Sequence, residues 1–297
     1  WIGHNLWSYF DKNDPSYPGS TKFESILRDF YILYDQFVGE IQNNIDDDTV
    51  FLLMSDHGFC RRPYNIFNIN LELKRLNLLK TKLKRKNASD PYYILEWIKK
   101  QGISFVNKYG AGRTMLKLVH TIPSLRKIYT VPPSINWSQT SAYVSDLSGI
   151  KPYFYGGIII NQKLVKLDEY IKISDLLIKH FSKMKKPGTE KLLFKWIKKR
   201  EDLYSGMYIE KYPDILFELD EDYGTGWSIT ESLFSKSKIH NIQSGSHSIH
   251  TPVFLVSNVN HHQLIKNSIN LEDICPSILY ILNIKNKLKF DGESIFL

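Results

Sequence analysis

The order of hydrophobic and polar positions along the chain predicts helices and strands in alternation. Hydrophobic residues between positions 23 and 45 recur every three or four residues, which predicts a helix with one apolar face. The residues at 21–24, TKFE, have the form of a capping box at its start. The apolar run at 50–54 predicts a strand that is covered on both faces of a sheet. This helix, loop and strand order is typical of an α/β layer.

Shorter patterns predict further elements of both kinds. Three prolines predict a loop over residues 122–138. The long stretch after the first strand, approximately residues 61–205, is predicted to be an insertion or cap within one α/β domain. The other predicted helices cover residues 70–79, 92–106, 170–185 and 271–282, and the other predicted strands cover residues 140–144, 156–161, 214–219 and 251–257.

Composition narrows the class of protein. A chain of 297 residues with 42% hydrophobic and 24% charged residues can bury a sizeable core. It has no apolar run long enough for a membrane span and no visible signal peptide, but it begins at Trp1 without a methionine, so we expect a fragment. Cys60 and Cys275 lack CxxC spacing, which argues against a disulfide scaffold and favours a reducing, cytoplasmic compartment.

The formal net charge of +8 comes partly from basic runs at residues 74–86, 183–186 and 195–200. Such runs can attract nucleic acid, anionic lipid or a phosphorylated substrate. Aromatic residues do not interleave with them as in a nucleic-acid platform. A solvated surface is therefore favoured, and no specific nucleic-acid partner is expected.

The candidate chemistry begins at the end of the first predicted strand, in the run DTVFLLMSDHGF. Asp56 and His57 follow that strand directly, where ligands bind in α/β sheets. A carboxylate with an imidazole is a ligand set for zinc or manganese. The alternative is a strand-to-turn junction in which Asp56 caps the next segment and His57 is incidental.

Two more histidines are candidate ligands. His4 lies in WIGHNLW, and His247 lies in a small-residue turn before the strand predicted at 251–257. No cysteine joins them, which disfavours a structural zinc finger. Ser246 and His250 are candidates for supporting contacts, whereas His261 and His262 are predicted to be surface residues.

Taken in order, these motifs resemble the alkaline phosphatase superfamily, and most closely its type I phosphodiesterase/nucleotide pyrophosphatase-like branch. His4 matches the histidine of that family's Asp-x-x-x-His segment. Asp56 and His57 match its Ser-Asp-His-Gly segment, and His247 matches its late Gly-x-His segment. The tail with Asp291-Gly292 is similar to its closing helix and turn. Three middle stretches resemble a branch of predicted phosphohydrolases or phosphomutases: FNINLELKRLNLL, INWSQTSAY and KREDLYSGMYIEKYPDILFEL.

The resemblance implies a three-layer α/β/α fold of alkaline phosphatase type with a mostly parallel sheet. It also implies two divalent metal ions, zinc or manganese, one shared by His4 and His247 and the other held by Asp56 and His57. The implied activity is hydrolysis of a phosphorylated small molecule, such as a phosphodiester or nucleotide pyrophosphate. The family's threonine or serine nucleophile and two aspartates fall upstream of Trp1, so we expect this chain alone to be inactive.

Three alternatives stay open. A phosphomutase would use the same metal site. A sulfatase needs a Cys/Ser-x-Pro-x-Arg segment, and residues 60–63, CRRP, have the wrong spacing and follow the SDHG segment. The alternative from a different class is a basic module that binds nucleic acid or anionic lipid.

Overall fold

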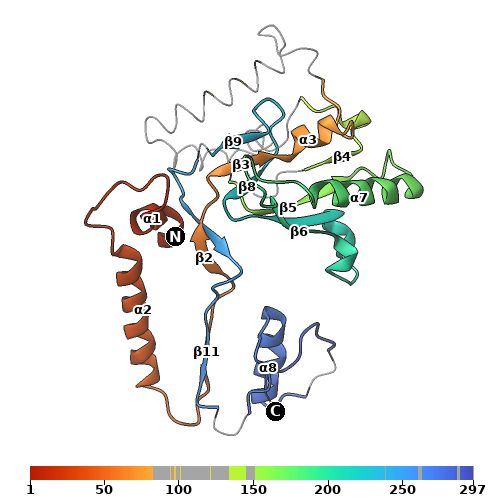
Figure 1. Ribbon diagram of the computed structural model, residues 1–297. Coiled ribbons are helices and arrows are strands. Elements are labelled where there is room, and N and C mark those ends of the chain that lie inside the picture. Colours follow the sequence, from red (N-terminus) through yellow and green to blue (C-terminus); the bar gives the residue numbers. More distant parts are fainter. Residues whose placement is uncertain are drawn as a thin grey trace. The chain divides into compact units, whose positions relative to one another are not determined.

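The chain divides into two compact units (Figure 1). The larger unit comprises Trp1–Thr21 and Arg61–Ser246, and the smaller unit comprises Lys22–Cys60 and His247–Leu297. That the larger unit contains a cap on a catalytic domain stays a prediction. The computed structural model describes residues 1–82, 134–144, 151–237, 239–259, 263–285 and 288–296, together with the single residues 94, 97, 101 and 121. Most of the helix predicted at 92–106 and of the loop predicted at 122–138, together with His261 and His262, lies outside the described residues.

In the part of the chain that the structure describes, the larger unit contains two sheets and three helices. Its first sheet is antiparallel and has the strand order β4 (Ala142–Tyr143), β5 (Tyr155–Ile160), β7 (Ile215–Leu219) and β6 (Phe194–Lys199). Its second sheet has the order β8 (Tyr223–Gly226), β3 (Asn65–Asn68) and β9 (Phe234–Lys236). The helices are α1 (Ile2–Phe10), α3 (Ile69–Arg75) and α7 (Leu167–Phe181), and single 3-10 turns are η1 (Trp137–Gln139), η2 (Arg200–Asp202) and η3 (Ile209–Lys211).

A cluster of phenylalanine rings joins these elements into one core. Phe67 of β3 and Phe181 of α7 are fully buried, and their ring centroids lie 6.2 Å apart. The ring of Phe194 lies 5.2 Å from that of Phe181 and 5.4 Å from that of Phe217. Edge-on and tilted aromatic pairs at these spacings are favourable beyond the area they bury. The cluster therefore packs α7 on β6 and links both sheets (Figure 1).

The smaller unit is built on one pair of strands. β1 (Phe51–Met54) pairs antiparallel with β11 (Phe254–Ser257), with Met54 opposite Phe254. The other elements are α2 (Ile26–Gln42), η4 (Leu271–Asp273) and α8 (Ile274–Ile281). β2 (Gly58–Arg61) and β10 (Gly245–Ser248) form a further two-stranded sheet, and the boundary between the units falls within both strands.

The mixed α/β class is confirmed, but the mostly parallel sheet is not. Among the described strands with an assigned direction, only β3 and β8 pair in parallel. The apolar run of β1 was expected to lie in a sheet covered on both faces, yet its residues are partly exposed and Met54 is 38% exposed. An apolar run signals burial potential but does not determine the direction of the neighbouring strand.

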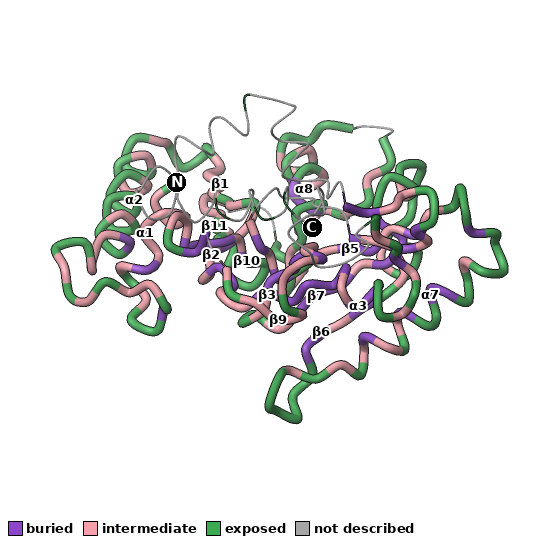
Figure 2. The backbone as a smooth tube through the Cα atoms, turned by 90° about the horizontal axis from the view of Figure 1, so that it is seen from above, coloured by how far each residue is buried: buried purple, intermediate pink, exposed green. Residues whose placement is uncertain are grey.

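The predicted start of the first long helix is wrong. The TKFE segment at 21–24 precedes the helix: α2 begins at Ile26, and the Ser25 hydroxyl donates to Asp29 over 2.6 Å. The predicted apolar face is only partly covered: Leu27 is buried, whereas Tyr34 is 58% and Phe37 57% exposed (Figure 2). The described hydrophobic residues buried in the smaller unit are only Leu27, Ile274, Ile295 and Phe296.

Most of the other predicted elements are present within the described chain. The predictions at 140–144, 156–161 and 214–219 correspond to β4, β5 and β7, those at 70–79 and 170–185 to α3 and α7, and those at 251–257 and 271–282 to β11 and α8. The basic run at 195–200 forms most of strand β6, and no strand was predicted there from the sequence. Both cysteines are free thiols, as expected. Of the helices that the structure describes, none has the length and apolar character of a membrane span.

Asp273 holds the chain's closing turn against α8. One carboxylate oxygen accepts the Asn270 backbone N–H over 3.0 Å, and the other accepts the Glu293 N–H over 3.0 Å and the Lys266 ammonium over 2.8 Å. The Ser277 hydroxyl accepts the N–H of Ile295 over 3.0 Å. The hydrogen bond from Lys266 and those from the two backbone groups lower the pKa of Asp273 to about 2.

Replacing Asp273 with alanine should destabilise the fold. The Asp273 side chain is 3% exposed, so its loss leaves two part-buried backbone donors and one ammonium without their acceptor. We expect the free energy of unfolding to fall by about 2 kcal/mol at pH 7. The difference in unfolding free energy between wild type and Asp273→Ala should shrink as the pH falls from about 4 toward 2. The reason is that the pKa of Asp273 in the folded chain lies below its unfolded value of about 3.9.

Urea unfolding at several pH values measures this effect. The exposed neighbour Glu272 serves as the control, and Glu272→Gln should leave the unfolding midpoint nearly unchanged. A difference between wild type and Asp273→Ala that grew on acidification would contradict the assignment.

Candidate metal centre

The end of strand β1 is fixed by backbone and side-chain hydrogen bonds to the segment before β11. The Ser55 N–H donates to the Val253 carbonyl over 2.9 Å, and the Val253 N–H donates to the Ser55 hydroxyl over 2.8 Å. A side chain on Gly58 would overlap Thr251, because its Cβ would lie 2.5 Å from the Thr251 carbonyl carbon. Asp56 and His57 therefore project from a short turn whose two sides are both packed against the same partner segment.

The two side chains of this turn lie at the spacing of a pair of metal ligands. The Nδ1 of His57 lies 2.9 Å from the Gly58 carbonyl, which can only accept, so Nδ1 carries the proton. Nε2 then presents its lone pair, and it lies 3.5 Å from the Asp56 carboxylate. The Asp56 side chain is 80% exposed, whereas that of His57 is 29% exposed.

His247 lies directly on His57. The two imidazole rings are stacked with centroids 4.0 Å apart and an interplanar angle of 25°. Phe59 meets both rings edge-on, at 5.6 Å from His57 and 6.3 Å from His247. The Cys60 thiol donates to the His247 carbonyl over 3.2 Å. Strands far apart in the sequence thus bring Asp56, His57 and His247 into one cluster of the smaller unit.

His4, the fourth predicted ligand, belongs to the larger unit. Its Nδ1 donates to the Gly245 carbonyl over 3.1 Å. Burial lowers the pKa of His4, and the positive charge of Arg62 lowers it as well, against the raising effect of the bond to Gly245. The imidazole is therefore neutral near pH 7, which is the form that binds metals. Its sharing of a metal with His247 stays a prediction from the sequence resemblance.

The donor types and the closest spacing fit a divalent metal, but a complete cage is not formed. Within the described ranges, no group of three or more His, Cys, Asp or Glu side chains is arranged to hold a metal ion. Asp56 and His57 supply one oxygen and one nitrogen at a suitable separation. Of the two candidate supporting residues, Ser246 has a buried hydroxyl without a hydrogen-bond partner in the described structure, and His250 is exposed.

Two buried groups near the predicted histidines were not recognised from the sequence. Arg62, in the CRRP segment that was considered only as a sulfatase motif, is fully buried. His240 forms an ion pair with Asp14 at 2.9 Å, and both side chains are 0% exposed. Burial raises the pKa of Asp14, but hydrogen bonds with His240 and Ser16 lower it more, so the net shift is downward. The burial of Arg62 depends on carbonyl groups of Pro152, Gln243 and Gly245, which are distant in sequence, so no local pattern indicates it.

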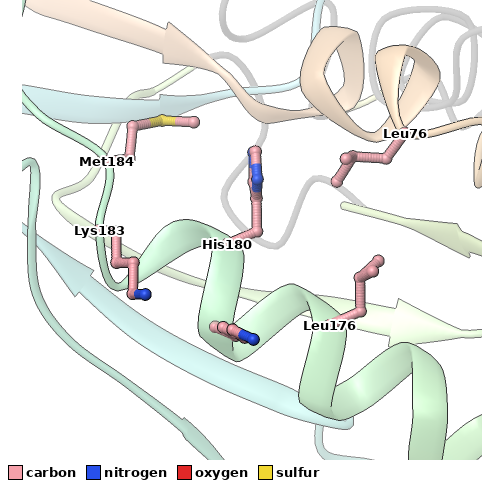
Figure 3. Close-up of a pocket in the computed structure, with 6 residues that line it drawn as sticks. Leu76, Leu176, His180, Lys183 and Met184 are labelled. Carbon is pink, nitrogen blue, oxygen red and sulfur yellow. The ribbon is translucent and has the colours of Figure 1, made fainter.

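A pocket of the larger unit is lined by none of the predicted site residues. Its volume is about 570 Å³, and Figure 3 shows Leu176 and His180 of α7 together with Leu76, which follows α3. His180 lies 3.0 Å from the Glu72 carboxylate, so its imidazole has a structural partner. The residues that line the pocket are Leu76, Leu176, Lys179, His180, Lys183 and Met184. They offer an apolar floor with two amines and do not provide metal-ligand chemistry.

Substituting Gly58 tests the packing that forms the turn. Gly58→Ala should lower the free energy of unfolding by about 2 kcal/mol, because the new methyl group overlaps the Thr251 backbone. Gly39→Ala in α2 is the matched control, since nothing lies within 4 Å of its Cβ position. This control should raise stability by about 1 kcal/mol. Equal urea midpoints for wild type and Gly58→Ala would contradict the close packing.

Comparison with known proteins assigns neither a family nor a function. No protein-family model, curated protein or solved structure matches the chain. The functional argument therefore depends on the arrangement of the chain's own residues and on the motif resemblance.

Proposed function

We propose that the chain is part of a metal-dependent phosphoric-ester hydrolase of the phosphodiesterase/nucleotide pyrophosphatase-like type. It would use two divalent ions, zinc or manganese, and act on a phosphorylated small molecule. The resemblance supplies the reaction class, a threonine or serine nucleophile upstream of Trp1, and the finer three-layer fold of alkaline phosphatase type. The observation that carries the proposal is the geometry of Asp56, His57 and His247.

The spacing of Asp56 and His57 supports a shared ion. Zinc binds carboxylate oxygen and imidazole nitrogen at about 2.0–2.2 Å, so two ligands at a tetrahedral angle lie roughly 3.3–3.5 Å apart. The Asp56 oxygen and His57 Nε2 are 3.5 Å apart. This is longer than a good charged hydrogen bond, which is about 2.7–2.9 Å. The backbone bond at Nδ1 is also the usual partner of a metal-binding histidine.

The stacking of His57 and His247 supports two ions rather than one. Stacked imidazoles hold their ring nitrogens in nearly parallel planes, so a single ion does not easily lie in the plane of both rings. This agrees with the ligand division that the resemblance implies.

The roles of the chain's own residues follow from their charges. The Asp56 carboxylate would offset part of the positive charge of the ions, and the neutral histidines would bind without adding charge. When bound, a pair of divalent ions stabilises negative charge on the attacking and leaving oxygens of a phosphoester. Phe59, edge-on to both rings, keeps the imidazoles in place.

The binding-module alternative is weakened by the pairing of its basic residues. In the basic runs of the described chain, several cations have acidic partners, which leaves less charge for a polyanion. The bond to Asp220 raises the pKa of Lys186, as expected for a paired ammonium. The pairs are Lys185 with Glu190, Lys186 with Asp220, Lys195 with Glu218 and Glu221, Lys199 with Asp175, and Arg200 with Glu201. A phosphomutase or a sulfatase would use the same ligands and is distinguished by its substrate.

Metal analysis tests the proposed ligands directly. The wild-type chain should bind at least one Zn²⁺ or Mn²⁺, measured by elemental analysis and calorimetry. Asp56→Asn and His57→Ala should each weaken Zn²⁺ binding by more than the roughly 10–100-fold that loss of an outer hydrogen-bond partner costs. Asp47→Asn, an exposed aspartate of the smaller unit, should bind as wild type does. Fewer than one ion per wild-type chain, or unchanged binding by Asp56→Asn, would overturn the proposal.

Binding of inorganic phosphate separates a phosphoester site from a simple zinc site. Calorimetry with the zinc-loaded chain should detect phosphate binding that a chelator removes and that His247→Ala weakens. Tighter binding of sulfate than of phosphate would favour the sulfatase alternative. Retention on an oligonucleotide that falls with salt and ignores the chelator would instead support the binding module.

A further inference from the structure

Arg62 is a buried cation that binds three carbonyl groups through the three nitrogens of its guanidinium. Nε donates to Gln243 over 2.9 Å, Nη1 to Pro152 over 3.3 Å and Nη2 to Gly245 over 2.8 Å. The guanidinium carbon lies 5.0 Å from the centre of the Tyr153 ring. A charge buried this deeply is stabilised only where its geometry and its partners are well matched.

The contacts of Arg62 concentrate on one short segment. Its backbone N–H donates to the Ser244 carbonyl over 2.7 Å, so Arg62 binds the carbonyls of three successive residues, 243, 244 and 245. An apolar side chain of similar volume would fill the same space without desolvating a charge. What it would not supply is the planar fork that holds these carbonyls in fixed directions.

The Gly245 carbonyl is shared between Arg62 and His4. It accepts Nη2–H of Arg62 over 2.8 Å and Nδ1–H of His4 over 3.1 Å, which uses both lone pairs of the oxygen. Because a carbonyl only accepts, His4 must carry its proton on Nδ1 and present a lone pair on Nε2. A Cβ on Gly245 would lie 2.8 Å from the Gly3 carbonyl carbon, so only glycine lets α1 come this close.

Other contacts attach the same N-terminal residues to the same segment. The backbone N–H of Ser8 donates to the Ser244 hydroxyl over 2.8 Å, and Asp14 pairs with His240. These contacts fix where α1 lies. The direction of the Gly245 carbonyl, in contrast, is set by the guanidinium fork that binds it.

We propose that Arg62 is a positioning residue that fixes the tautomer and orientation of His4 through the Gly245 carbonyl. It also fixes the start of strand β10, two residues before His247. The metal-binding consequence rests on the proposed function, but the control of the tautomer does not. Hydrogen-bond partners of this kind orient metal-binding imidazoles and select the ligating nitrogen.

The tautomer of His4 is measured by long-range ¹H–¹⁵N correlation of the metal-free chain at pH 8, where histidine is neutral. Wild type should show the proton on Nδ1. Arg62→Lys keeps the charge but cannot reach three carbonyls, so His4 should populate both tautomers and Zn²⁺ affinity should fall about 10–100-fold. Tyr153→Leu, which removes the ring beside the guanidinium, should shift both readouts less and in the same direction. Arg61→Lys is the control, because the neighbouring Arg61 is paired with Asp222 at 3.2 Å and makes no contact with Gly245 that the structure describes.

Each outcome decides the proposal. A wild-type His4 with its proton on Nε2 would overturn it, with no variant needed. So would a folded Arg62→Lys, judged by circular dichroism, that kept the wild-type tautomer and Zn²⁺ affinity. If Arg62→Lys does not fold, Tyr153→Leu is the deciding variant. A changed His4 tautomer in Tyr153→Leu supports the proposal, and an unchanged tautomer overturns it. If Arg62→Lys changes the His4 tautomer but the wild-type chain binds no zinc, the proposed function is overturned and the positioning role of Arg62 is supported.

Discussion

The orientation of His4, the proposed metal ligand in the larger unit, depends on the backbone carbonyls of residues 243–245. These three groups are bound by Arg62, and the third is also bound by His4. Backbone carbonyls are suited to this task because their positions follow from the path of the chain and they remain acceptors at every pH. An imidazole held by such a group has one defined tautomer, which a side-chain partner that can rotate or titrate does not guarantee.

The sequence predicted element types and candidate donors better than it predicted their pairing. The strands at 214–219 and 251–257 and the adjacency of Asp56 to the end of β1 followed from local patterns. The antiparallel pairing of β1 with β11 did not, because strand direction depends on partners about 200 residues away. Strand β6 was read as a basic surface run, since a bulge between Phe194 and Trp196 breaks its two-residue alternation. The burial of Arg62 depends on carbonyls distant in sequence and has no local signal.

The two units differ in how fully they bury their apolar residues. The larger unit has an aromatic core, whereas α2 of the smaller unit exposes Tyr31, Ile32, Leu33, Tyr34 and Phe37 (Figure 2). Exposed apolar side chains gathered on one helix are suited to contact with other polypeptide or apolar surface. The same observation explains why the predicted buried face of this helix was inaccurate: apolar periodicity indicates that a face can be buried, not that the described residues cover it.

The burial of each proposed ligand is consistent with its charge. Asp56 is the one carboxylate among the four, and its side chain is 80% exposed, against 29% for that of His57. A carboxylate that stays hydrated costs little in the absence of a cation, whereas burying it unpaired is expensive. The imidazoles are neutral when unprotonated, so burial is tolerable for them, and the lowered pKa of His4 keeps it in that form. The proposed ligands Asp56 and His57 therefore carry little electrostatic cost without a cation, and a cation bound there would displace water from Asp56.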